Sequence, residues 1–183
     1  MAETPSVDSW TKYQLRQELF SIGEDFWIEN DKGEQVFKVD GKVFTLRETF
    51  MLQDKDGAEL ATVQSKLLSF QPTMTIERGG QIVATVEKAL FTLFHSHFDI
   101  DVAGGAPLEA GGDFLSHEFE ITANGHTVAT ISKRWFTLQD TYGIGIAPGQ
   151  DEVLLLCAAV CIDEMSEARP ASPFPQTPSS PFH

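Results

Sequence analysis

The sequence predicts a mainly β protein in which a sheet wraps around one buried helix near the C-terminus. Three observations indicate this fold: a long apolar run late in the chain, a repeated strand–turn–strand pattern before it, and regular alternation of side chains within the repeats. A sheet that curls around a helix also removes its own exposed edges. We therefore expect a single layer of strands with a helix at its centre.

The apolar run Val153–Ile162 is hydrophobic on every side and is flanked by the acidic pairs Asp151-Glu152 and Asp163-Glu164. A surface helix carries a polar stripe, whereas a helix that is apolar all round is buried in protein or in lipid. At about 15 residues, roughly 22 Å, it is shorter than the roughly 20 apolar residues that a membrane span needs. The sequence predicts a central helix over about residues 151–165 and no transmembrane segment.

The helix also carries both cysteines of the chain, four residues apart. Their flanks are aliphatic, and no further cysteine is present to complete a metal site, so we interpret both as reduced residues of the core. The predicted core residues of the helix are Leu154, Leu155, Cys157, Ala158 and Cys161.

Two segments before the helix repeat each other. Residues Ile76–Leu93 read IERGGQIVATVEKALFTL, and residues Ile121–Leu138 read ITANGHTVATISKRWFTL. Two weaker copies surround Gly33 and Gly57. Each copy has the order strand, glycine turn, strand, which predicts a series of hairpins.

Alternation gives the repeated strands an inner and an outer face. Alanine occupies the equivalent inward position in three copies, next to larger apolar residues, which indicates the close approach of something bulky. We expect that bulky element to be the helix. The three alanines are Ala61, Ala84 and Ala129.

Turn signals separate the expected strands. Asn30–Gly33 is typical of a hairpin turn, and Asp40-Gly41 is interpreted as a second tight turn. Asp54–Gly57 resembles the start of a calcium loop, but Val63 stands where the bidentate glutamate is required, so a hairpin turn is the better interpretation. The glycine-rich segment Ala103–Gly112 is expected to contain no strand.

Length and composition predict one domain with two unstructured ends. Residues 1–12 are expected to form a flexible N-terminus, residues 13–165 the barrel domain, and residues 166–183 a disordered tail rich in proline and serine.

Charge limits the classes of partner. The formal net charge is −14 and the isoelectric point about 4.6, so the surface repels phosphate backbones and nucleic acid is not an expected partner. The first residues show no signal-peptide pattern, which favours a cytoplasmic location, either free or peripheral at a membrane. No cofactor motif is present, and no cofactor is expected.

One expected strand carries His95, His97, Asp99 and Asp101 on a single face. Imidazole and carboxylate ligands suit zinc or another divalent ion. The alternative is the solvated face of an amphipathic strand, and same-face neighbours lie almost 7 Å apart, so at most two of them reach one ion. These residues are therefore weak metal candidates, and no catalytic constellation is apparent.

Basic residues recur at equivalent strand ends in the two strong repeats. Lys88, Lys133 and Arg134 are the candidates for a patch that binds an anionic ligand such as a lipid headgroup. The alternative is that they are ordinary solvated strand ends.

Several segments, in order and with sensible spacing, resemble the LURP-one-related family. They are Leu19–Ile28, Phe37–Lys42, Lys66–Thr73, Asp113–Ile121, Lys133–Gly143 and Asp151–Asp163. The resemblance implies a Tubby C-terminal-like fold, a closed antiparallel β-barrel of about 12 strands around a central hydrophobic C-terminal helix. This fold is similar to that of Tubby proteins, which bind phosphatidylinositol bisphosphate, and to that of phospholipid scramblases.

Residues and resemblance together favour a non-enzymatic binding or scaffold module. Its expected target is a phosphoinositide-containing membrane surface or a protein partner. Two alternatives stay open at this point. One is a metal-dependent enzyme that uses the face with His95 and Asp101, and the other is a carrier of a small apolar ligand.

Overall fold

The structure, a computed structural model, describes residues 9–16, 26–44, 47–89, 97–113, 116, 118–132 and 141–167. Its elements run in the order β1 Thr11–Arg16, β2 Phe26–Asn30, β3 Gln35–Phe44, β4 Arg47–Asp54, β5 Glu59–Ser65, β6 Thr73–Arg78, β7 Gln81–Lys88, β8 His97–Val102, β9 Leu108–Asp113, β10 Glu118–Ala123, β11 His126–Ser132, β12 Thr141–Ile146 and α1 Glu152–Glu167.

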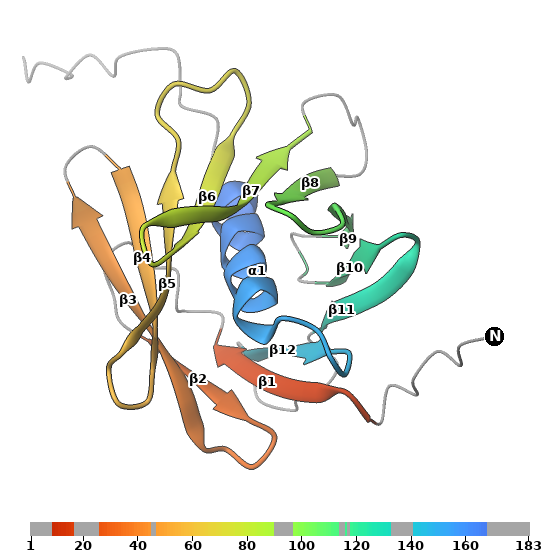
Figure 1. The fold of residues 1–183 in the computed structure, drawn as a ribbon. Coiled ribbons are helices and arrows are strands. Elements are labelled where there is room, and N and C mark those ends of the chain that lie inside the picture. Colours follow the sequence, from red (N-terminus) through yellow and green to blue (C-terminus); the bar gives the residue numbers. More distant parts are fainter. Residues whose placement is uncertain are drawn as a thin grey trace, which may run out of the picture.

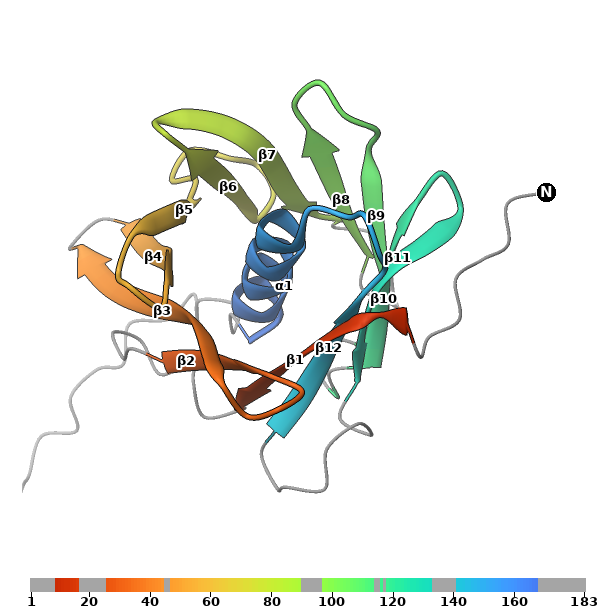
Figure 2. The same ribbon diagram turned by 60° about the horizontal axis from the view of Figure 1, so that its bottom comes forward.

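The strands form one closed antiparallel barrel. Each strand pairs with its neighbour in sequence, and β1 also pairs with β12, where Thr11 lies opposite Ile146. Closure leaves the sheet without an open edge. The strands surround α1, which passes through the middle of the ring (Figure 1; Figure 2). The expected 12-stranded barrel around a central helix is confirmed.

The repeat corresponds to four hairpins of one design. Gly80 and Gly125, which occupy equivalent positions in the strong copies, have φ angles of 76° and 77°. Only glycine adopts this left-handed conformation without a steric cost. The register shifts by one residue after Ile76 in one hairpin and after Ile121 in the other, again equivalent positions, and similar shifts follow Ile28 and Leu52.

The inward positions of the strands form the core together with α1. Ala61, Ala84 and Ala129 are each at most 1% exposed, as are Val86 and Ile131. The helix lies closest to β5, β6, β7 and β12. Small residues on β5 and β7 allow this approach, whereas Ala129 belongs to β11, which is not among those nearest strands.

Polar contacts fix the N-terminal end of α1 to the barrel. The Asp151 carboxylate accepts a hydrogen bond from the backbone N–H of Leu154 at 3.1 Å and so caps the helix. It also receives two hydrogen bonds from the Arg78 guanidinium on β6, at 2.6 and 2.7 Å. These contacts, led by the hydrogen bond from Arg78, lower the pKa of Asp151. Glu152 adds a third tie, because it accepts a 2.6 Å hydrogen bond from the Tyr13 hydroxyl.

Two turn predictions are confirmed and one is wrong. The Asn30 side chain accepts hydrogen bonds from the N–H groups of Lys32 and Glu34, and Asp54 does the same for Asp56 and Ala58. Both segments are hairpin turns. The predicted turn at Asp40-Gly41 is wrong, because β3 continues to Phe44 and Gly41 pairs with Phe50.

The segment Ala103–Gly112 was expected to lack a strand, yet it includes most of β9, Leu108–Asp113. Glycines weaken a strand but do not prevent it when neighbouring strands supply the ladder. Here β10 pairs with all of β9, and β8 pairs with residues 108–111. Gly112 is required here, since an added Cβ would lie 2.5 Å from the Glu118 carbonyl oxygen and its φ is 145°.

The ends of the domain also differ slightly from the prediction. Strand β1 begins at Thr11, and Trp10 is buried, so the flexible N-terminus does not extend to residue 12. At the other end α1 continues through Ser166 to Glu167. The Ser166 hydroxyl donates to the Ile162 carbonyl oxygen at 2.6 Å within this last turn. The predictions for residues 1–8 and 168–183 lie outside the described residues.

Candidate functional site

A groove of about 540 Å³ lies on the outer face of β5, β6 and β7. Its nine lining residues are Gln64, Ser65, Lys66, Leu67, Leu68, Thr75, Glu77, Ile82 and Thr85. The side chains that form the inner wall of the same three strands pack in the core. The groove therefore lies directly behind the contact between the barrel and α1.

Two cross-strand rows make the floor of the groove. In one row Gln64, Thr75 and Thr85 lie opposite one another on β5, β6 and β7. In the other row Glu77 of β6 lies between Thr62 and Ile82. Alternation explains the placement of the residues in the first row and of Glu77, because the intervening residues point to the core. Ile82 has the same parity as the buried Ala84, and the register shift after Ile76 turns it to the outer face. β-Branched threonines give the floor a firm, partly apolar surface.

Apolar side chains stand at both ends of the groove. Leu68 is 97% exposed at one end, on the segment Lys66–Pro72 between β5 and β6, and Ile82 is 54% exposed at the other. Phe70 is fully exposed on the same segment. Several large apolar residues exposed side by side on a short segment are typical of an interaction surface.

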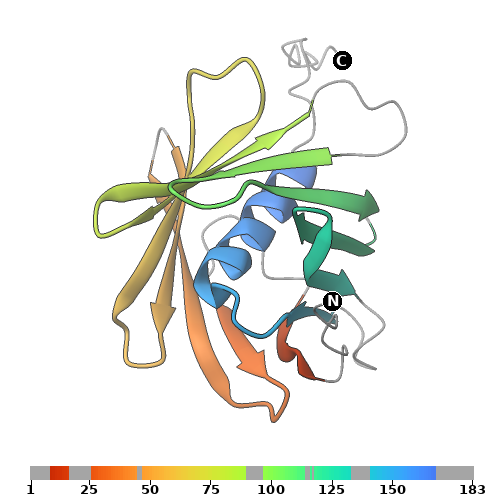
Figure 3. The same cartoon turned by 45° about the vertical axis from the view of Figure 1, so that its right-hand side comes forward.

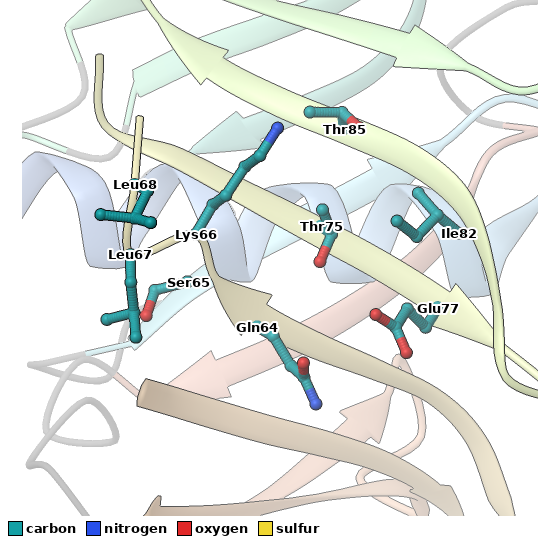
Figure 4. A pocket seen from close by; sticks show the side chains of 9 residues that line it. All are labelled: Gln64, Ser65, Lys66, Leu67, Leu68, Thr75, Glu77, Ile82 and Thr85. Atoms are coloured by element: carbon teal, nitrogen blue, oxygen red, sulfur yellow. The ribbon is translucent and has the colours of Figure 1, made fainter. Parts of the chain in front are cut away.

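The charges of the groove are few and balanced. Figure 4 shows Leu67, Leu68 and Lys66 toward one end, Thr75 in the middle, and Ile82 and Glu77 toward the other end. Lys66 and Glu77 are thus separated, and the lining contains no histidine or cysteine. The arrangement suits non-covalent contact with an apolar segment.

Lys88 is engaged at the end of the helix. Its Nζ donates a 2.7 Å hydrogen bond to the Met165 carbonyl oxygen and lies 5.9 Å from the centre of the Phe98 ring. A cation is favoured there because the last carbonyls of a helix carry partial negative charge. Burial lowers the pKa of Lys88. Lys133 and Arg134, the other two residues of the predicted anionic patch, lie outside the described residues.

The structure brings two of the candidate metal ligands together. The His97 ring nitrogen lies 3.2 Å from an Asp99 carboxylate oxygen, and Asp101 follows on the same exposed face of β8. Within the described ranges, no three histidine, cysteine or acidic residues are grouped so that they could hold a metal ion. His95 lies outside those ranges.

Cys157 and Cys161 are free thiols in the core, 1% and 0% exposed. Burial raises the pKa of Cys157 to about 12 and also raises that of Cys161. Because the thiolate is the reactive form, neither residue is suited to nucleophilic chemistry. Leu154, Leu155 and Ala158 are buried beside them.

Sequence reasoning did not find the groove. The available signal was the run Lys66–Pro72, where Leu67, Leu68 and Phe70 fall between two expected strands. Apolar residues between strands are either folded onto the core or exposed for binding, and a pattern does not distinguish the two. The exposed fractions decide this, because Leu68 and Phe70 have almost no protein neighbours.

Comparison with known proteins identifies the family. The model of the LURP-one-related family matches residues 11–163, which includes every strand and most of α1. The chain belongs to the LURP-one-related family. It is 31% identical over 148 residues to the uncharacterised protein YxjI of Bacillus subtilis (strain 168), a match that covers 81% of this chain and 88% of YxjI.

A solved structure supports the fold of this LURP-one-related protein. An X-ray structure of a protein from Arabidopsis thaliana superposes with a TM-score of 0.64, covering 86% of this chain and 91% of that one. At 18% identity this likeness concerns the fold alone. Among the described helices, none has the length and hydrophobicity required to cross a membrane.

Proposed function

We propose that this LURP-one-related protein is a non-enzymatic binding module that takes an apolar segment of a partner protein into the groove over β5–β7. The observation that carries the proposal is the exposure of Leu68 and Phe70 beside a groove of about 540 Å³. Ligand pockets typically measure about 300–1,000 Å³. Burial of one leucine or phenylalanine side chain contributes about 1.5–3 kcal/mol, so these two residues supply a useful anchor.

A membrane surface is the second candidate, and the same apolar segment favours it, because Lys66 adjoins Leu67 and Leu68 as in residues that insert at a headgroup boundary. Charge argues against it. The chain has a formal net charge of −14, Lys66 is the single cation of the groove, and Lys88 binds the end of α1. Anionic lipids attract basic patches and repel an acidic surface.

The two alternatives from the sequence have less support. A metal-dependent enzyme on β8 has only the His97–Asp99 contact among described residues to build on. An apolar carrier needs an empty interior, whereas the barrel interior holds the buried side chains of α1, including Leu156 and Ile162.

The test selects binding peptides by phage display against the full chain and measures their affinity by calorimetry. Leu68→Ser should weaken a selected peptide about 10- to 100-fold, the equivalent of losing one buried leucine. Lys55→Ser, on the exposed β4–β5 turn, is the matched control and should leave the affinity unchanged.

A parallel measurement separates protein from membrane. Full-length protein is sedimented with neutral, phosphatidylserine and phosphoinositide vesicles at two salt concentrations. Peptide binding that depends on Leu68, without sedimentation, supports the proposal. Two results together would instead support binding to a membrane surface. They are salt-sensitive sedimentation with phosphoinositide vesicles alone and a peptide affinity that Leu68→Ser leaves unchanged.

A further inference from the structure

The chain leaves the central helix beside the groove. The Met165 carbonyl oxygen, in the last turn of α1, accepts a hydrogen bond from Lys88 Nζ at 2.7 Å. The backbone N–H of Lys88 donates in turn to the Pro72 carbonyl oxygen at 3.0 Å. Two hydrogen bonds thus connect the end of α1 to the segment Lys66–Pro72, and Figure 3 shows both at the same end of the barrel.

Residues 168–183 follow this exit and have an unusual composition for this chain. They contain Arg169 and no Asp or Glu, although the whole chain carries 27 acidic residues. They hold two phenylalanines, Phe174 and Phe182. They also hold most of the nine prolines, at Pro170, Pro173, Pro175, Pro178 and Pro181. Such a segment favours an extended conformation and is not repelled by an acidic barrel.

The length of this segment matches the groove. Phe174 is seven residues beyond Glu167, the end of α1, a span of roughly 22 Å at the rise of a polyproline helix. The groove follows β6, whose six residues extend roughly 20 Å. A segment of this length is long enough to bring Phe174 over the groove, whereas the 15 residues from Glu167 to Phe182 span roughly 46 Å at the same rise, more than twice the length of the groove.

We propose that residues around Phe174 occupy the groove of their own barrel, with the Phe174 ring between Leu68 and Ile82. The flanking Pro173 and Pro175 then lie over the threonine row of Thr75 and Thr85. Apolar contact at both ends and the absence of acidic residues next to Glu77 make this segment complementary to the groove. Proline restricts the free segment beforehand, so binding costs less conformational entropy.

The inference rests on the proposed function, since it identifies the ligand class as an extended segment rich in proline and phenylalanine. It adds regulation, because an intramolecular occupant competes with any partner. If the tail fills the groove in about nine of ten molecules, the apparent affinity for a partner falls about tenfold.

The experiment compares amide NMR spectra of full-length wild type, Phe174→Ser and Phe182→Ser. Phe174→Ser should shift the resonances of Thr75, Glu77, Ile82 and Thr85 and leave β10 and β11 unchanged. Phe182→Ser is the matched control, with the same chemical change farther along the tail, and should shift none of them. The shifts should not depend on protein concentration, because the contact is within one molecule.

Three results would overturn the inference: unchanged groove resonances in Phe174→Ser, equal shifts in both variants, or shifts that vanish on dilution. The last would assign the occupant to a second copy. A phage-selected peptide keeps this test separate from that of the proposed function. If the peptide binds wild type and Phe174→Ser equally through Leu68, the tail is not the occupant and the proposed function stands. Tighter binding to Phe174→Ser, by about tenfold, supports both.

Discussion

The two faces of β5–β7 differ in what covers them. On the inner face Ala61, Ala84 and Ile76 are at most 1% exposed and pack with α1 in one core. On the outer face, alternate residues of the same strands form a groove flanked by Leu68 and Ile82, which remain exposed. The inner face has its partner in the same domain, covalently attached. Under the proposed function, the outer face is where a partner binds.

The comparison also separates the roles of apolar residues. Inside, they determine stability, because α1 and the strands fill the space between them at the density of a protein interior. Outside, they add little to folding and are available for recognition. Substitutions on the inner face should therefore change the free energy of unfolding, and substitutions on the outer face should change the affinity for a partner. Three expected effects on stability are given in order, from the largest to the smallest.

Ala84→Phe should destabilise the fold by about 1–3 kcal/mol, because a ring does not fit between β7 and α1. Thr85→Phe, the neighbouring outward residue, is the matched control and should change the free energy of unfolding by less than about 0.5 kcal/mol. Urea denaturation of both variants measures the difference. Equal costs at the two positions would show that Ala84 does not face the helix.

Asp151→Ala should cost about 1 kcal/mol by removing the cap of α1 and its pair with Arg78, a pair that solvent screens in part. Asp151→Asn keeps a capping oxygen and should recover much of this loss. The folded state lowers the pKa of Asp151. The contribution of its carboxylate to the free energy of unfolding is therefore complete above the unfolded pKa of about 3.9 and declines as the pH falls toward the folded pKa.

The measurement is urea denaturation of wild type and both variants between pH 7 and pH 2.5. The difference between wild type and Asp151→Ala should shrink below about pH 4. A difference that stays constant over this range would mean that the carboxylate charge has no part in holding the helix.

Leu68→Ser should leave the free energy of unfolding within about 0.5 kcal/mol of wild type, because the side chain is 97% exposed. Thermal and urea denaturation of the variant used in the peptide test check this directly. A loss of stability comparable with that of Ala84→Phe would mean that Leu68 is part of the core in solution, and the contrast between the two faces would disappear.

Much of the fold followed from the sequence because local pattern determines it. A run that is apolar on all sides, such as Val153–Ile162, has one stable place in a small domain, and a hairpin with Gly80 at its turn needs only local geometry. The inward parity of Ala84 is likewise fixed by the period of two along a strand. Two predictions were wrong because a glycine was interpreted as the end of a strand. Pairing with a neighbouring strand keeps both Gly41 and Gly112 in the sheet.

The tertiary structure determined which distant residues each side chain contacts, which side-chain alternation and secondary-structure propensity do not specify. The sequence predicted Lys88 as part of a patch for an anionic ligand or as a solvated strand end, and only the position of α1 shows that its partner is the Met165 carbonyl. The groove required the registers of three strands, which bring Gln64, Thr75 and Thr85 into one row. Whether Leu68 is buried or exposed depends on which distant residues reach it. Such neighbours are set by the closing of the whole barrel, and for that reason no local pattern in the sequence specifies them.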